Sequence, residues 1–81
     1  MKIRVHVTPR KGVLDPQGQA VAGGLKSLGF AAAGEVRVGK IVDINLEGVT
    51  DKDEALALGQ DMAEKLLAND IVEDFDVQVL S

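Results

Sequence analysis

Cysteine is absent from this 81-residue chain, and its aromatic residues are limited to Phe30 and Phe75. Without cysteine the chain has no disulfide, no thiolate metal site and no thiol nucleophile. Its formal net charge is -4, whereas surfaces that bind nucleic acid are normally basic and often carry aromatic stacking platforms. We therefore expect no nucleic acid among its partners.

Long apolar runs are also missing. Nowhere do apolar residues continue for the roughly 18 to 20 positions that a membrane-spanning helix needs. Residues 1–6 alternate between apolar and polar from the start, unlike the apolar centre of a signal peptide. These features predict a cytoplasmic protein that does not bind membranes. The chain reads as a single domain over residues 1–81, too small for a large core, so oligomerisation is the expected source of extra stability.

The residues that usually carry catalysis are scarce. His6 is the sole imidazole, and no cysteine or clustered ligand set accompanies it. The glycines at positions 18, 23, 24 and 29 fall within or after a predicted helix, so they do not form the strand-to-helix loop that cradles phosphates. We expect no catalytic, cofactor-binding or metal-binding residue in this chain.

A helix is predicted over residues 16–28. Asp15 is a typical N-cap, and Pro16 suits the first helical position because it has no amide to leave unpaired. Gly29 suits the left-handed residue of a Schellman motif, with Phe30 folding back onto the helix. Three glycines inside the helix, at positions 18, 23 and 24, weaken it by about 0.5 to 1 kcal/mol each relative to alanine. They indicate either close backbone packing or simple tolerance of glycine within a stable assembly.

Apolar residues at even positions predict one long strand over residues 36–46, bent or bulged at Gly39. A two-residue hairpin turn at Gly39-Lys40 would instead put Asp43 and Asn45 on the core face. At about 3.4 Å per residue the strand reaches roughly 37 Å, whereas the helix before it covers only around 20 Å. A projecting strand needs a partner, so we expect a dimer that shares a sheet.

The charges beside the bend have two interpretations. Lys40 lies on the even, otherwise apolar face, where its stem could cover apolar surface while its ammonium reaches water. Alternatively, Arg37 and Lys40 contact another subunit. The sequence pattern alone leaves both open.

A second helix is predicted from Asp51, with Glu54 completing a capping box, to about Ala68. Its apolar arc is wider than a one-sided helix needs, so we expect part of it to face another subunit; the arc contains Ala55, Leu56, Leu58, Met62, Ala63, Leu66 and Leu67. Alternating residues 2–8 and 71–80 complete the order β-α-β-α-β. The predicted fold is α+β, with a small, mostly antiparallel sheet, two helices on one face and extension of the sheet by dimerisation.

Five short segments follow one another in a single register between about residue 7 and residue 75. They are Asp15-Pro16-Gln17-Gly18, Leu28-Gly29-Phe30, Arg37-Val38-Gly39-Lys40, Lys65-Leu66-Leu67-Ala68-Asn69 and Ile71-Val72-Glu73-Asp74-Phe75. Together they closely resemble the PurS family, the small subunit of phosphoribosylformylglycinamidine (FGAM) synthase.

This resemblance implies a role in de novo purine biosynthesis. PurS-like proteins are dimers or tetramers that join the glutaminase subunit PurQ to the synthetase subunit PurL, which uses ATP and magnesium. Because the glutaminase holds the reactive cysteine and the synthetase the nucleotide, the resemblance implies that this chain binds no cofactor and contributes assembly and a protected route for ammonia. The implied interface residues are Leu14, Asp15, Pro16, Gln17, Gly18, Arg37, Val38, Gly39 and Lys40.

Two other classes of function compete with this one. A small dimeric ACT-like or ferredoxin-like ligand-sensing module would also pair through its sheet, but it does not account for the five matched segments. An acidic metal carrier is disfavoured by the missing cysteines and the single histidine.

Overall fold

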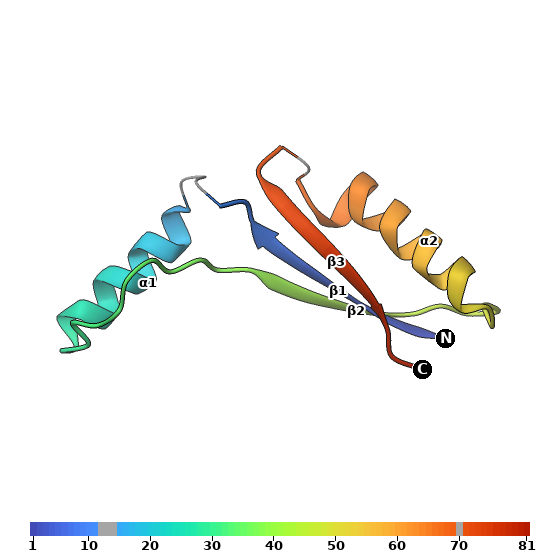
Figure 1. The fold of residues 1–81 in the computed structure, drawn as a ribbon, viewed down its shortest axis with the longest axis horizontal. Helices are drawn as coiled ribbons and strands as arrows, with labels where there is room; N and C mark the ends of the chain where they lie inside the picture. The colour runs from blue at the N-terminus through green and yellow to red at the C-terminus, as the bar shows by residue number, and fades with distance from the viewer. Residues whose placement is uncertain (12–14, 70) are drawn as a thin grey trace.

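A computed structural model describes residues 1–11, 15–69 and 71–81. Its elements are β1 (Lys2–Pro9), α1 (Pro16–Ser27), β2 (Lys40–Asn45), α2 (Lys52–Met62), the π-helix η1 (Ala63–Leu67) and β3 (Glu73–Val79). The strands form one antiparallel sheet in the order β2-β1-β3 (Figure 1). The predicted α+β class, the β-α-β-α-β order and the antiparallel sheet are confirmed.

The core lies between α2 and the sheet. In the central strand, Ile3, Val5 and Val7 are fully buried, while the residues between them face the open side of the sheet. Gly59 brings α2 close, because an added Cβ would lie 2.6 Å from Val77 Cγ1 and 2.9 Å from Ile3 Cδ1. The absence of a side chain at Gly59 therefore sets the distance between helix and sheet.

The second helix begins as predicted and ends differently. The Asp51 carboxylate accepts a hydrogen bond from the Glu54 amide at 3.2 Å, which confirms the N-cap. Its last turn is a π-helix, in which the Ala68 amide donates to the Ala63 carbonyl. This wider turn rotates Leu66 away from the predicted apolar arc, and the Leu66 side chain is 84% exposed. Leu66 is therefore not part of the core of a single chain, and the expectation that part of the arc faces another subunit stays a prediction.

The first helix ends in the predicted Schellman motif. The Phe30 amide donates to the Leu25 carbonyl at 3.0 Å, and Gly29 adopts a φ of 99°. However, α1 extends past the end of the sheet, whereas α2 packs against its face (Figure 1). The apolar side of α1 consequently stays open, with Val21 43% and Leu28 76% exposed.

The molecule is elongated, with extents of 49 × 25 × 14 Å and a radius of gyration of 15.9 Å. A compact domain of this length would have a radius of gyration of about 12 Å. The difference comes from α1 and the chain that follows it, which project from one end of the sheet (Figure 1). We call residues 35–39 the extension, because they run back along α1 and lead directly into β2.

The extension replaces the first half of the predicted long strand. β2 starts at Lys40, opposite Val7, so the prediction of a paired strand from residue 36 is wrong. In this register Val38 falls opposite Pro9, which has no amide to donate, and the Val38 amide bonds to Asp15 instead. Residues 36 and 37 fall opposite positions beyond the end of β1. No hairpin forms at Gly39-Lys40, as the phase of the apolar residues predicted.

Candidate functional site at the contact between helix α1 and the extension

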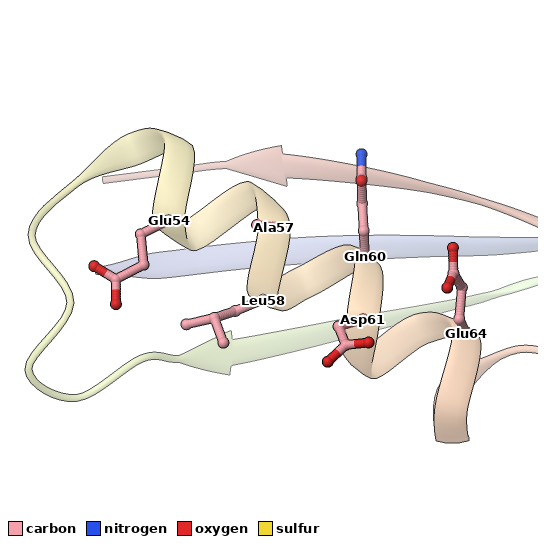
Figure 2. A pocket seen from close by; sticks show the side chains of 6 residues that line it. All are labelled: Glu54, Ala57, Leu58, Gln60, Asp61 and Glu64. Atoms are coloured by element: carbon pink, nitrogen blue, oxygen red, sulfur yellow. The ribbon is translucent and has the colours of Figure 1, made fainter.

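A hollow of 470 Å³ lies on the outer face of α2 (Figure 2). It is lined by Glu54, Ala57, Leu58, Gln60, Asp61 and Glu64, and all of these residues come from the α2–η1 helix. The Asp61 carboxylate is already paired with Lys65 Nζ at 3.1 Å.

Over residues 1–11, 15–69 and 71–81, no group of three or more histidine, cysteine or acidic side chains could hold a metal ion. In the same ranges, no helix has the length and apolar character to cross a membrane.

The beginning of α1 is tied to the extension by one hydrogen bond. Asp15 Oδ2 accepts from the backbone amide of Val38 at 2.8 Å, across 23 positions of sequence. Two of the segments that carry the family resemblance, residues 15–18 and 37–40, therefore meet in space. We call their meeting point the contact region.

Asp15 does not cap α1 through a side-chain hydrogen bond of normal geometry, contrary to the prediction. Its carboxylate is turned towards the extension instead. The pKa of Asp15 lies below its usual value, chiefly because the Val38 amide donates to the carboxylate and secondly because the Gly18 amide faces it. The first turn of α1 thus stabilises the charge while the extension donates a hydrogen bond to it.

Gly18 makes this close approach possible. It is buried, and an added Cβ would overlap the carbonyl oxygen of Val36 and lie 2.7 Å from Asp15 Oδ2. The predicted close backbone packing is confirmed at Gly18. The prediction of close packing is wrong within one chain for Gly23 and Gly24, because an added Cβ at either position would meet nothing within 4 Å.

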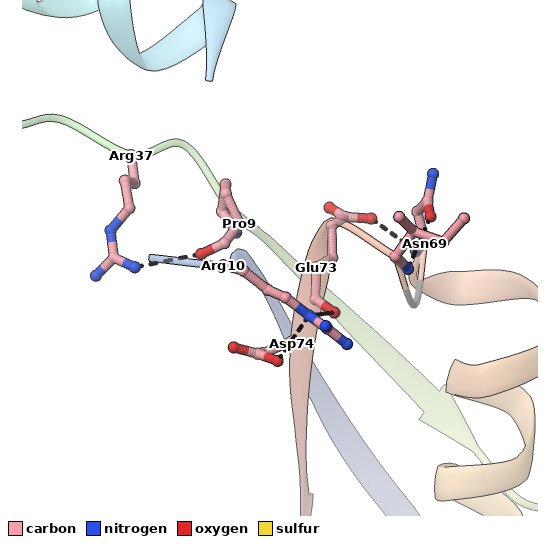
Figure 3. A network of polar contacts seen from close by, with 7 residues as sticks. Pro9, Arg10, Arg37, Asn69, Glu73 and Asp74 are labelled. Carbon is pink, nitrogen blue, oxygen red and sulfur yellow. Dashed lines mark hydrogen bonds and ion pairs between the residues drawn. The ribbon is translucent and has the colours of Figure 1, made fainter. Parts of the chain in front are cut away.

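The second half of the contact region touches the end of β1. Arg37 Nη1 donates to the Pro9 carbonyl at 3.2 Å (Figure 3). Gly39 passes so close to β1 that an added Cβ would lie 2.5 Å from the Val7 carbonyl oxygen. Lys40 is exposed and forms no ion pair with any residue that the structure describes.

The remaining predicted interface residues lie at the start of α1. Pro16 and Gln17 are exposed there. Leu14 lies outside the described residues. The structure therefore brings Asp15, Gly18 and Val38 into one contact, with Arg37 and Gly39 beside it, whereas Pro16 and Gln17 take no part in that contact.

A neighbouring polar network was not predicted from the sequence. Arg10 Nε lies 3.3 Å from Asp74 Oδ1 and 3.4 Å from the Glu73 carbonyl oxygen (Figure 3). Glu73 Oε1 in turn accepts from the Asn69 amide at 2.8 Å. The network joins the end of β1 to the start of β3, and Arg10 and Glu73 are 63 positions apart in the sequence. No local sequence signal marks such a contact.

A known protein family matches nearly the whole chain. The sequence model of the PurS family, described as phosphoribosylformylglycinamidine (FGAM) synthase, matches residues 2–81. The chain belongs to the PurS family. The PurS subunit of FGAM synthase from Mycobacterium leprae is 44% identical over 73 residues, which cover 90% of this chain and 87% of that subunit.

Solved PurS structures share the fold. Bacillus subtilis PurS superposes with a TM-score of 0.85 at 38% identity and covers 99% of this chain and 98% of its own. A Thermotoga maritima structure described as PurLQS gives a TM-score of 0.83 at 28% identity, over 98% of this chain and 95% of the other. The predicted family is confirmed, and this chain is a PurS subunit of FGAM synthase.

Proposed function

We propose that this chain is a non-catalytic subunit that bridges the glutaminase PurQ and the synthetase PurL and helps ammonia pass between them. The observation that carries the proposal is an elongated chain with a small core that matches PurS subunits over nearly its whole length. The related Thermotoga maritima chain comes from a structure described as PurLQS, which supports partnership with the other subunits.

Exposed apolar side chains support a role in assembly. Among the described residues, seven large ones are well exposed in a single chain: Val21, Leu28, Phe30, Ile41, Leu66, Ile71 and Leu80. They lie on or just after α1, on β2, on or just after η1 and just after β3, rather than around one pocket. Where such side chains form a contiguous patch, the patch usually marks a protein interface. The proposed partners are therefore further copies of this chain, as a dimer or tetramer, together with PurQ and PurL.

The chemistry of ammonia explains why two active sites need such a subunit between them. Free ammonia takes up a proton in neutral water and then has no lone pair for attack. Two separate active sites thus need a sealed path, and an elongated subunit between them can align and close it. In this proposal PurL binds the ATP and magnesium, and the complex works in the cytoplasm. The contact region shapes the contacts between subunits.

Size-exclusion chromatography of the purified subunits tests the bridge. PurQ and PurL are mixed with glutamine, magnesium and ADP, with and without this chain. We expect the two larger subunits to elute together only when the chain is present. Equal co-elution in its absence would refute the bridging role.

A further inference from the structure

The outer side of β3 is a sheet edge without a neighbouring strand (Figure 1). The Leu80 amide donates to the Lys2 carbonyl at 2.8 Å, which continues the β1–β3 ladder in the same register. Because bonding alternates along an antiparallel pair, the even-numbered residues of β3 bond to β1. Phe75, Val77 and Val79 therefore direct their backbone N–H and C=O groups away from the sheet. Within the described part of the chain, none of these three residues makes a backbone hydrogen bond outside the ladder.

β3 is a regular edge strand of seven residues. Its pairing with β1 keeps one register from Glu73 to Val79, with no bulge to twist the edge away. It contains neither proline nor lysine, which commonly protect an exposed edge from pairing. Large apolar side chains lie just beyond its two ends, with Ile71 77% and Leu80 41% exposed. The edge is thus open to β-strand addition, in which main-chain hydrogen bonds provide the affinity.

The edge is acidic on the face of the sheet away from α2. Residues 71–80 contain three acidic residues and no lysine or arginine. Asp74 and Asp76 are both exposed on that face. Arg10 pairs with Asp74 at 3.3 Å, whereas no ion pair among the described residues involves Asp76, although His6 lies opposite it on β1. The Asp76 carboxylate is therefore available to a cationic group on a neighbouring strand.

These carboxylates disfavour a second copy of the chain at the β3 edge. In the two antiparallel registers centred near the middle of the strand, acidic residues would face one another. A two-fold axis at Phe75 would set Asp74 opposite the second copy's Asp76, and an axis at Asp76 would set that residue opposite its own equivalent. Like charges in facing positions destabilise a sheet, whereas opposite charges stabilise it. Charge therefore favours a basic strand from a different protein.

We propose that the β3 edge receives an extended segment of PurL or PurQ that carries lysine or arginine at alternate positions. The backbone of this segment bonds to the outward groups of Phe75, Val77 and Val79. Its basic side chains lie beside Asp74 and Asp76, and its remaining side chains lie on the opposite face of the sheet, because side chains alternate along a strand. The inference rests on the proposed function and names the surface through which this chain meets a larger subunit.

Hydrogen exchange of individual backbone amides tests the edge. The wild-type chain is exposed to deuterated buffer alone and with purified PurL and PurQ, glutamine, magnesium and ADP. In the chain alone, the amides of Phe75 and Val77 should exchange fast, whereas those of Asp76 and Gln78, which bond to β1, should exchange slowly. Binding should slow exchange at Phe75 and Val77 by at least about tenfold. Unchanged exchange in a formed complex would overturn the proposal, and slow exchange of both amides in the chain alone would assign the edge to a second copy instead.

A charge reversal tests the chemistry of the partner segment. Asp76→Lys should weaken binding about tenfold, because a pair of opposite charges becomes a pair of like charges. Glu47→Lys makes the same change in net charge at an exposed residue in the turn after β2 and should leave the affinity unchanged. Fluorescence anisotropy of the labelled chain, titrated with PurL and PurQ in turn, measures both variants and identifies the subunit that supplies the segment. Equal affinities for the wild type and Asp76→Lys would refute a basic segment.

These outcomes are separable from the proposed function. Co-elution of PurQ and PurL with unchanged exchange at Phe75 and Val77 would refute only the β3 edge. Slower exchange at these amides with a subunit that binds the chain but is not joined to the other subunit would refute only the bridging role.

Discussion

Gly18→Ala tests whether the contact between α1 and the extension holds the projecting part of the molecule in place. Its Cβ would overlap the Val36 carbonyl oxygen and lie 2.9 Å from the Val36 carbonyl carbon. Both atoms belong to the backbone, so no side-chain rotation can relieve the overlap. The extension must move away from α1, which also lengthens the hydrogen bond between Asp15 and Val38.

The expected magnitude combines two opposing effects. Alanine inside a helix is favoured over glycine by about 0.5 to 1 kcal/mol. Overpacking of a close contact costs about 1 to 3 kcal/mol, so Gly18→Ala should lower the free energy of unfolding by up to about 2.5 kcal/mol. Gly23→Ala, in the same helix with open space around it, should raise the free energy of unfolding by about 0.5 to 1 kcal/mol.

Urea unfolding followed by circular dichroism measures both variants against the wild type. All samples need the same protein concentration, because self-association adds to apparent stability by mass action. The two alanine variants should shift the urea midpoint in opposite directions with a similar slope. If Gly18→Ala is as stable as Gly23→Ala, the contact region does not hold the extension against α1.

Two further substitutions test the charge and the core. The Asp15 pKa is lower in the folded chain than its ordinary value of 3.8, so its ionisation stabilises the fold above that pH. Urea unfolding at several pH values should show the wild type more stable than Asp15→Asn at pH 7. The difference in the free energy of unfolding should shrink below pH 3.8 and vanish below the pKa of Asp15 in the folded chain. A difference that does not change with pH would contradict this reasoning. Gly59→Ala should lower the free energy of unfolding by about 1 to 3 kcal/mol, because its Cβ would press on the stiff Val77 side chain. A midpoint equal to that of the wild type would show that α2 can move away from the sheet at no cost.

Local chemistry predicted the element ends well. The Asp51 cap and the Gly29 stop depend on residues within five positions of one another, so the sequence contains their full explanation. The alternation of apolar residues likewise predicted the buried face of β1. The order of alternating and helical stretches predicted the overall fold, and the five matched segments predicted the family.

Contacts between residues far apart in the sequence could not be predicted from these local patterns. Asp15 carries the residue type of an N-cap, yet its carboxylate bonds to an amide 23 positions away. The predicted pairing of residues 36–39 was wrong because it depends on the neighbouring strand, where Pro9 lacks an amide opposite Val38 and β1 then ends. The pattern of residues 36–46 contains no information about that neighbour. The predicted interface residues Pro16, Gln17 and Lys40 face solvent in one chain, and their role depends on partners.

The central claim is that this chain couples two active sites without catalysing a reaction. The most direct test measures FGAM formation by PurQ and PurL with either glutamine or a high concentration of ammonium chloride as nitrogen donor, with and without the chain. Omitting it should abolish the glutamine-dependent rate while part of the ammonia-dependent rate remains. Full glutamine-dependent activity without the chain would contradict the account.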